Sequence, residues 1–188
     1  MPDDYTFFDL HAALQDAFGW EDAHLHQFFT SSPFKRERNY QQIALPSPEM
    51  EDVLDEREEK LFRWFKNSKS VVWYEYDFGD SWMHEIQLEK KLPQESNKKY
   101  PFLLDGARAC PPEDCGGLGA YCDLIRIITD QKSPERADML EWLGIDNPKD
   151  FDPAAFDPSK VKFQNPRQRL KEYERGYGIY RSLTPKSD

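Results

Sequence analysis

Four histidines are the residues of this chain best suited to chemistry: His11, His24, His26 and His84. Alternation along a strand over residues 24–29 would place His24 and His26 on the same side. Imidazole nitrogens are common zinc ligands. The pair therefore predicts part of a metal site, with His84 as the third histidine ligand.

Carboxylates elsewhere in the sequence could complete such a site or act in catalysis. Mixed histidine and carboxylate ligands suit a divalent metal such as Zn²⁺, and also Mn²⁺ or Fe²⁺. His84 is a catalytic candidate as well as a predicted ligand. The carboxylate candidates are Asp77, Asp80, Glu113 and Asp114.

The histidines also have a simpler explanation. His11 and His84 fall on the apolar faces of the elements predicted below. A buried imidazole in such a place is commonly a hydrogen-bonded part of the core, and buried groups mark functional sites only in some cases. The structural interpretation is the stronger one, and the metal site is the alternative.

Three cysteines lie in a segment rich in glycine and proline. An odd number inside a short window does not make a secreted disulfide framework. With His84 they could form a zinc site, although the spacing is a weak signal. Cys110 is also a catalytic candidate, since a thiol nucleophile needs a neighbouring base such as His84. The cysteines are Cys110, Cys115 and Cys122.

The same segment, CPPEDCGG, has a plainer structural interpretation. Paired prolines and paired glycines predict a stiff loop with a sharp turn. Glu113 and Asp114 would then lie at the tip of the loop, where they could line a pocket or belong to a packed connection.

Composition and motifs disfavour several classes of protein. The DFG at residues 77–79 lacks the other motifs of a kinase. No apolar run reaches the roughly 20 residues of a membrane span. Acidic residues follow Met1 where a secretory signal would be basic. We therefore expect a cytoplasmic protein that does not contact the membrane.

Charge is unevenly distributed along the chain. The net charge of −10 makes nucleic-acid binding by the body unfavourable. Residues 159–188, however, carry eight Lys/Arg and three Asp/Glu. This basic segment could dock on the body, on a partner or on nucleic acid, but a solvated helix is the simplest prediction.

Hydrophobic patterns predict an α+β fold. Thr6 and Asp9 have capping-box spacing and Gly19 is a stop signal, so a helix is expected over residues 7–18. Apolar periodicity predicts further helices, and alternation predicts short strands. The further helices span residues 49–65, 119–130, 133–144 and 166–178, and the strands span residues 24–29 and 100–104.

Residues 71–90 predict a β-hairpin. Apolar side chains occupy the even positions of both halves and polar side chains the odd ones. Directly opposed residues share a face, so apolar residues meet only across a loop of odd length. We therefore expect strands 71–78 and 82–90 joined by residues 79–81.

This loop length has a consequence for pairing. Tyr76 would lie opposite His84, and Tyr74 opposite Ile86. Two acidic residues, Glu75 and Glu85, would then face one another, which is mildly unfavourable. The pair is a weak sign of a bound cation.

Several short motifs, in this order, resemble the Ri-plasmid ORF-3-like family, whose members are also described as transposon-passenger TnpR-like proteins. The motifs are FFDLHAALQDAFGWEDAHLHQF, YEYDFGDSWMHEIQLEK, ARACPPEDCGG, LEWLG and FDPAAFD, and the resemblance spans roughly residues 5–160. It implies a compact α+β domain associated with plasmids and mobile elements, and no established activity. It also implies a preceding strand with a PPIWRR-like segment, which this sequence lacks, so that strand is dispensable or its sheet edge is covered by something else.

The sequence therefore predicts one α+β domain over residues 1–163, with a mainly antiparallel sheet packed on helices, and a basic helix or tail over residues 164–188. The expected function is a non-enzymatic cytosolic accessory module that binds a protein partner or a small ligand. The alternative is a metal-dependent hydrolase or nuclease-like enzyme that uses His24, His26, His84 and nearby carboxylates.

Overall fold

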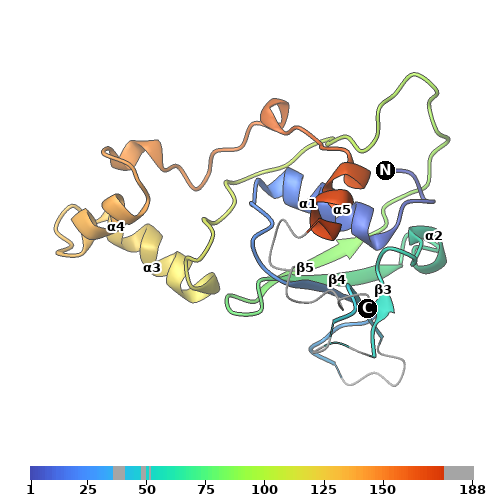
Figure 1. The fold of residues 1–188 in the computed structure, drawn as a ribbon. Helices are drawn as coiled ribbons and strands as arrows, with labels where there is room; N and C mark the ends of the chain where they lie inside the picture. The colour runs from blue at the N-terminus through green and yellow to red at the C-terminus, as the bar shows by residue number, and fades with distance from the viewer. Residues whose placement is uncertain (36–40, 48–49, 51, 176–188) are drawn as a thin grey trace.

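The computed structural model describes residues 1–35, 41–47, 50 and 52–175 (Figure 1). Helix α1 (Phe7–Phe18) has the predicted ends. Thr6 Oγ1 accepts a hydrogen bond from Asp9 N at 3.1 Å, and Thr6 N donates to Asp9 Oδ2 at 2.8 Å. Gly19, with φ of 86°, closes the helix, because glycine adopts this conformation without the steric cost of a side chain.

The described strands form one sheet, in the order β3-β2-β1-β4-β5. β2 and β3 are parallel, and the other neighbours are antiparallel. The predicted mainly antiparallel α+β architecture is confirmed. The strands are β1 (His26–Phe29), β2 (Gln42–Ala44), β3 (Leu54–Asp55), β4 (Val71–Tyr76) and β5 (Trp82–Gln87).

The remaining helices follow two different arrangements. In Figure 1, α1 and α5 lie side by side near the sheet, whereas α3 and α4 lie together at a distance from it. None of the described helices has the length and apolarity needed to cross a membrane. The α-helices are α2 (Leu61–Trp64), α3 (Gly117–Thr129), α4 (Arg136–Trp142) and α5 (Pro166–Glu174), with 3₁₀ turns at Pro148–Asp150 and Pro158–Lys160.

Aromatic side chains fill the space between α1 and the sheet. Phe7, Phe28 and Tyr74 are each fully buried. The rings of Phe7 and Phe28 meet edge to face with centroids 4.9 Å apart, a geometry that contributes beyond burial alone. The predicted alternation in β4 is confirmed, since Val72, Tyr74 and Tyr76 are buried.

The hairpin has the predicted parity but a different register. Even residues face even residues, yet Tyr76 pairs with Trp82 and Tyr74 with His84. The connecting loop therefore has five residues, 77–81, instead of three. Glu75 faces Met83, so the predicted Glu75–Glu85 pair is wrong and gives no sign of a cation.

Two other predicted elements are absent from the structure. Of the helix predicted over residues 49–65, residues 52–65 form the strand β3 and the short helix α2 instead, because Leu54 pairs with Ile43 in the sheet and the Glu56 carbonyl accepts a hydrogen bond from Phe8 N. These long-range bonds override the helical periodicity. Residues 100–104 form no strand, and Leu104 is 81% exposed.

Helix α5 is not simply solvated, as the sequence suggested. One face packs on α1 and buries Arg169 and Tyr173. Arg169 Nη2 lies 2.5 Å from Asp16 Oδ1, and Nη1 lies 3.1 Å from Asp22 Oδ2. The sequence underestimated this docking because its partners are acidic residues about 150 positions away. Residues 176–178 of the predicted helix lie outside the described residues, and the domain boundary at residue 163 stays a prediction.

We predict that Arg169→Met lowers the free energy of unfolding by about 3 kcal/mol, because it leaves two buried carboxylates without their cation. Urea denaturation of the full chain measures the change. Arg167→Met, on the exposed face of the same helix, is the matched control and should change stability by less than about 0.5 kcal/mol. Equal effects of the two substitutions would contradict the proposed role of the buried pairs.

Candidate functional site

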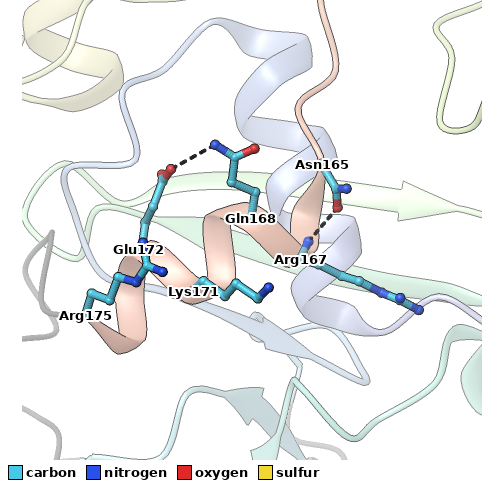
Figure 2. A pocket seen from close by; sticks show the side chains of 6 residues that line it. All are labelled: Asn165, Arg167, Gln168, Lys171, Glu172 and Arg175. Carbon is cyan, nitrogen blue, oxygen red and sulfur yellow. Dashed lines mark hydrogen bonds between the residues drawn. The ribbon is translucent and has the colours of Figure 1, made fainter.

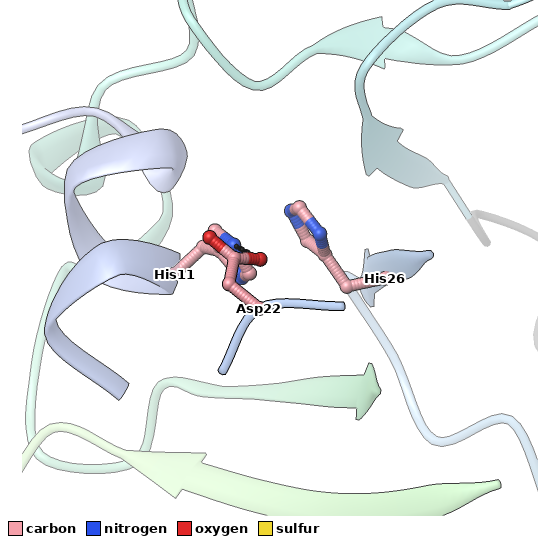
Figure 3. Close-up of side chains that lie close together, drawn as sticks. All are labelled: His11, Asp22 and His26. Atoms are coloured by element: carbon pink, nitrogen blue, oxygen red, sulfur yellow. Dashed lines mark hydrogen bonds and ion pairs between the residues drawn. The ribbon is translucent and has the colours of Figure 1, made fainter. Parts of the chain in front are cut away.

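Two groups of side chains in the described structure have the composition of a metal site. The first, here called the inner cluster, consists of His11, Asp22, His26 and Glu56. His11 comes from α1, Asp22 from the α1–β1 connection, His26 from the start of β1, and Glu56 follows β3. Figure 3 shows three of these side chains turned toward one another.

The inner cluster is closely packed. His11 Nε2 lies 2.9 Å from Asp22 Oδ1, and His26 Nε2 lies 2.8 Å from Glu56 Oε2. The two imidazole rings stack with centroids 3.4 Å apart and an interplanar angle of 1°. The side chains of His11, His26 and Glu56 are fully buried, and that of Asp22 is 8% exposed.

Further hydrogen bonds hold these groups in place. Tyr74 Oη lies 2.9 Å from His11 Nδ1 and accepts a hydrogen bond from Gln15 Nε2 at 3.0 Å. From α5, Tyr173 Oη donates to Asp22 Oδ2, beside the Arg169 contact. The orientation of the cluster therefore depends on α1, the sheet and α5 together.

The electrostatic environment separates the protonation states of Asp22 and His11. Burial acts to raise the pKa of the Asp22 carboxyl, but the charge and hydrogen bond of His11, with smaller effects from His26 and Tyr173, hold the pKa well below its usual range. Burial, followed by repulsion from His26, lowers the pKa of His11. Asp22 is therefore ionised at neutral pH, whereas burial works against a positive charge on His11.

The second group, here called the outer cluster, consists of His24, Asp77, Glu113 and Asp114. It lies between the start of β1, the hairpin loop and the proline-rich loop. His24 Nε2 is 3.1 Å from Asp114 Oδ1 and 3.8 Å from Glu113 Oε2, and His24 Nδ1 is 3.8 Å from Asp77 Oδ1. Asp114 is 73% exposed, so this cluster is open to solvent.

Part of the outer cluster has a structural role. Glu113 Oε1 accepts hydrogen bonds from Tyr76 Oη at 2.9 Å and from Glu21 N at 2.8 Å. Burial and the Glu113 contact raise the pKa of Tyr76, which remains a neutral donor. Asp77 Oδ1 accepts from Gly79 N at 2.9 Å and shapes the hairpin loop.

The predicted site residues therefore do not converge on one centre. His24 and His26 lie in different clusters, because β1 begins at His26 and His24 precedes it. His84 lies on β5 beside Phe18 and Trp20, with ring centroids at 4.7 and 5.6 Å. The structure therefore does not bring His24, His26 and His84 together, although His24 and His26 each belong to a cluster, and their role as metal ligands stays a prediction.

Asp80 serves the fold. Its Oδ2 accepts a hydrogen bond from Gly116 N at 2.9 Å, just before α3. A side chain on Gly117 would place its Cβ 2.6 Å from the Asp80 carbonyl oxygen, so this close approach requires glycine. Asp80 thus joins the hairpin loop to α3.

The cysteines show no sign of activation. All three are free thiols. Burial raises the pKa of Cys110 to about 12 and that of Cys115 to about 11. A nucleophilic cysteine needs the opposite shift, so this environment disfavours Cys110 as a nucleophile. The described metal-like groups contain no cysteine.

A hollow of about 470 Å³ lies on the exposed side of α5 (Figure 2). Its lining includes Arg167, Lys171 and Arg175, which are partly balanced by Glu172. Because these side chains are basic, nucleic-acid binding by the C-terminal segment stays a prediction.

Sequence patterns did not single out two members of the inner cluster. Asp22 lies in a short connection, and Glu56 lies in a segment predicted to be helical. His11 is one of the four histidines singled out by the sequence but is not among the predicted metal ligands. No local signal reveals these residues, because their neighbours come from four separate parts of the chain.

Comparison with known proteins places this geometry in a family. The sequence pattern of the plasmid pRiA4b ORF-3-like proteins matches residues 1–160. The chain belongs to this family. An uncharacterised protein of Sinorhizobium fredii, y4hQ, is 34% identical over 154 residues, which are 81% of this chain and 73% of the relative.

A crystal structure confirms the family fold. MM3350 of Methanosarcina mazei, described as a protein of unknown function, is 37% identical with a TM-score of 0.74. The match covers 87% of this chain and 86% of that one. The descriptions of these relatives include no activity, so any functional inference must come from the site itself.

We predict that iodoacetamide at pH 8 modifies Cys122 first, because it is exposed, whereas Cys110 and Cys115 react slowly until the chain unfolds. Mass spectrometry of tryptic peptides over a time course measures the order. Fast labelling of Cys110 in the folded chain would restore it as a nucleophile.

We also predict that His84 makes stability depend on pH. Burial lowers its pKa in the folded state, against backbone hydrogen bonds that raise it. Below its unfolded pKa of about 6.5, the unfolded state gains a proton first, so the free energy of unfolding falls as pH decreases from about 7 to about 5. His84→Leu should reduce this slope by up to one proton, or about 1.4 kcal/mol per pH unit. Urea denaturation across this range tests it, and unchanged slopes would contradict it.

Proposed function

We propose that this protein is a non-enzymatic interaction module that binds a basic protein partner through residues 117–157. This segment, here called the acidic arm, contains α3, α4 and the first 3₁₀ turn. The observation that carries the proposal is the position of the arm, which extends away from the sheet beyond its contacts at Gly117 and Tyr121, with most of its side chains exposed (Figure 1). An accessory role beside a plasmid or mobile-element function is part of the same proposal.

The placement of the candidate catalytic residues supports a non-enzymatic role. His11 and His26 are buried with protein partners. His84 packs against aromatic rings, and the Cys110 thiol is protonated at neutral pH because of its raised pKa. These environments suit structural groups better than groups that must reach a substrate.

Charge and apolar anchors define the kind of partner. The acidic arm contains nine Asp/Glu and four Lys/Arg. Leu118 and Trp142 are 69% and 47% exposed, and α4 has no buried residue. Complementary charge speeds association and selects partners, and an exposed tryptophan is a frequent centre of binding energy. A basic protein surface with an apolar pocket matches this arm, whereas nucleic-acid phosphates would be repelled.

A second candidate function is a metal-dependent hydrolase or nuclease at the outer cluster. The observation in its favour is that His24, Asp77 and Asp114 bring their ligand atoms within 4.8 Å of one another beside solvent. Such a site would leave room for water and substrate on the metal.

We expect carboxylate–amine cross-linking in cells that express the protein naturally to join the acidic arm to lysines of one basic partner. Three substitutions together, Asp138→Lys, Glu141→Lys and Trp142→Ser, should reduce the cross-linked product at least about tenfold. Quantitative mass spectrometry measures the product.

Glu89→Lys with Glu95→Lys is the matched control, because it makes the same change in net charge on exposed residues outside the arm. It should leave the cross-links unchanged. Equal losses in both variants would contradict binding through the arm. Metal-stimulated nuclease activity that disappears in His24→Ala would instead support the second candidate.

A further inference from the structure

The inner cluster has the spacing of metal ligands. His11, Asp22 and His26 each offer one ligand atom, and these atoms all lie within 4.8 Å of one another. Zn²⁺ holds imidazole nitrogens and carboxylate oxygens at about 2.0–2.2 Å, so its ligand atoms lie about 3–4 Å apart. To share one ion the stacked imidazoles would have to tilt toward each other, because a ring nitrogen binds a metal in the plane of its ring, and the ion would replace the hydrogen bond between His11 and Asp22.

Buried carboxyl groups outnumber the buried cationic side chain beside the cluster. Asp16, Asp22 and Glu56 are the buried carboxyl groups, and Arg169 supplies one positive charge. The stacked imidazoles are 3.4 Å apart, so positive charges on both rings would repel strongly. A further cation would therefore find favourable partners here.

An unpartnered oxygen beside the cluster is an independent sign that it can bind a cation. Glu56 is fully buried, and its Oε2 bonds to His26. Its second oxygen, Oε1, is buried with no hydrogen-bond partner among the described residues. Buried carboxylate oxygens are nearly always satisfied, and an exception often marks an absent ion or water.

The surrounding bonds resemble the support around protein metal sites. Glu56 orients His26, as carboxylates orient metal-bound histidines. Tyr74 holds the opposite nitrogen of His11, while Arg169 and Tyr173 hold the distal oxygen of Asp22. His11 Nε2 and Asp22 Oδ1 lie 2.9 Å apart and are hydrogen-bonded to each other, so an ion bound by both would take the place of this bond.

We propose that the inner cluster binds one divalent cation, with Zn²⁺ the best match, through His11, Asp22 and His26, with Glu56 as the carboxylate that orients His26. Because the ligands are buried, the ion is structural and does not meet a substrate. It ties α1, β1 and α5 together. This site is independent of the acidic arm and of the outer cluster.

Metal analysis of the full chain, purified without a metal-binding tag, tests the proposal. Protein dialysed against Zn²⁺ and passed over a gel-filtration column should retain about one equivalent, and removal by a strong chelator should lower the melting temperature by about 5 °C or more. Retention of less than about a tenth of an equivalent would overturn the proposal and leave protons as the only compensating charge.

Matched histidine variants locate the ion. His26→Gln should abolish retention, whereas His24→Gln, two residues away in the outer cluster, should preserve it. The reverse pattern would assign the metal to the outer cluster and overturn the proposal.

X-ray absorption spectroscopy of the zinc-loaded wild-type chain keeps the test valid if His26→Gln fails to fold. Two imidazoles in the coordination sphere are expected, because the inner cluster has two histidines and the outer cluster has one. A single imidazole would contradict the proposed site. None of these measurements depends on the partner of the acidic arm, so the two proposals can fail separately.

Discussion

The burial of the Asp22 carboxylate is the constraint on which the rest of the structure depends. An ionised group away from water must be surrounded by donors or positive charge. Here His11 supplies one contact from α1, and Arg169 and Tyr173 supply others from α5. Satisfying one carboxylate therefore fixes two helices against the connection that leads into β1.

This constraint explains why the histidines do not assemble at an open pocket. His11 is needed beside Asp22, and His26 stacks on His11 while bonding to Glu56. Both imidazoles are fully buried and contact carboxylates of the protein. His24, although only two residues from His26, precedes β1 and meets the carboxylates of the loops instead. One short HxH segment thus serves two unrelated environments.

The division between body and acidic arm follows from where apolar surface is buried. The aromatic residues of α1, β1 and β4 pack into one core. The arm contributes two buried apolar side chains, Leu124 and Ile128, and exposes most of its charged residues together with Leu118 and Trp142. The core therefore lies in the body, and most side chains of the arm are exposed.

Local chemistry in the sequence determined the limits of α1, the parity of the hairpin and the aromatic face of β4. Each depends on hydrogen bonds or alternation within a few residues, as in the Thr6–Asp9 capping box. The outer carboxylates were also foreseeable, since the prolines of the 110–117 loop mark a stiff, exposed tip. The predicted helix over residues 49–65 failed because strand pairing of Leu54 outweighed a local preference.

Only the tertiary structure decided the hairpin register, the roles of the four histidines and the membership of the inner cluster. Asp22 and Arg169 are 147 residues apart, and nothing near either one shows that they share a buried site. Which charges are removed from water together depends on how whole elements pack. That packing depends on residues far apart in the chain, whereas caps, turns and alternation depend on residues that are neighbours in the sequence.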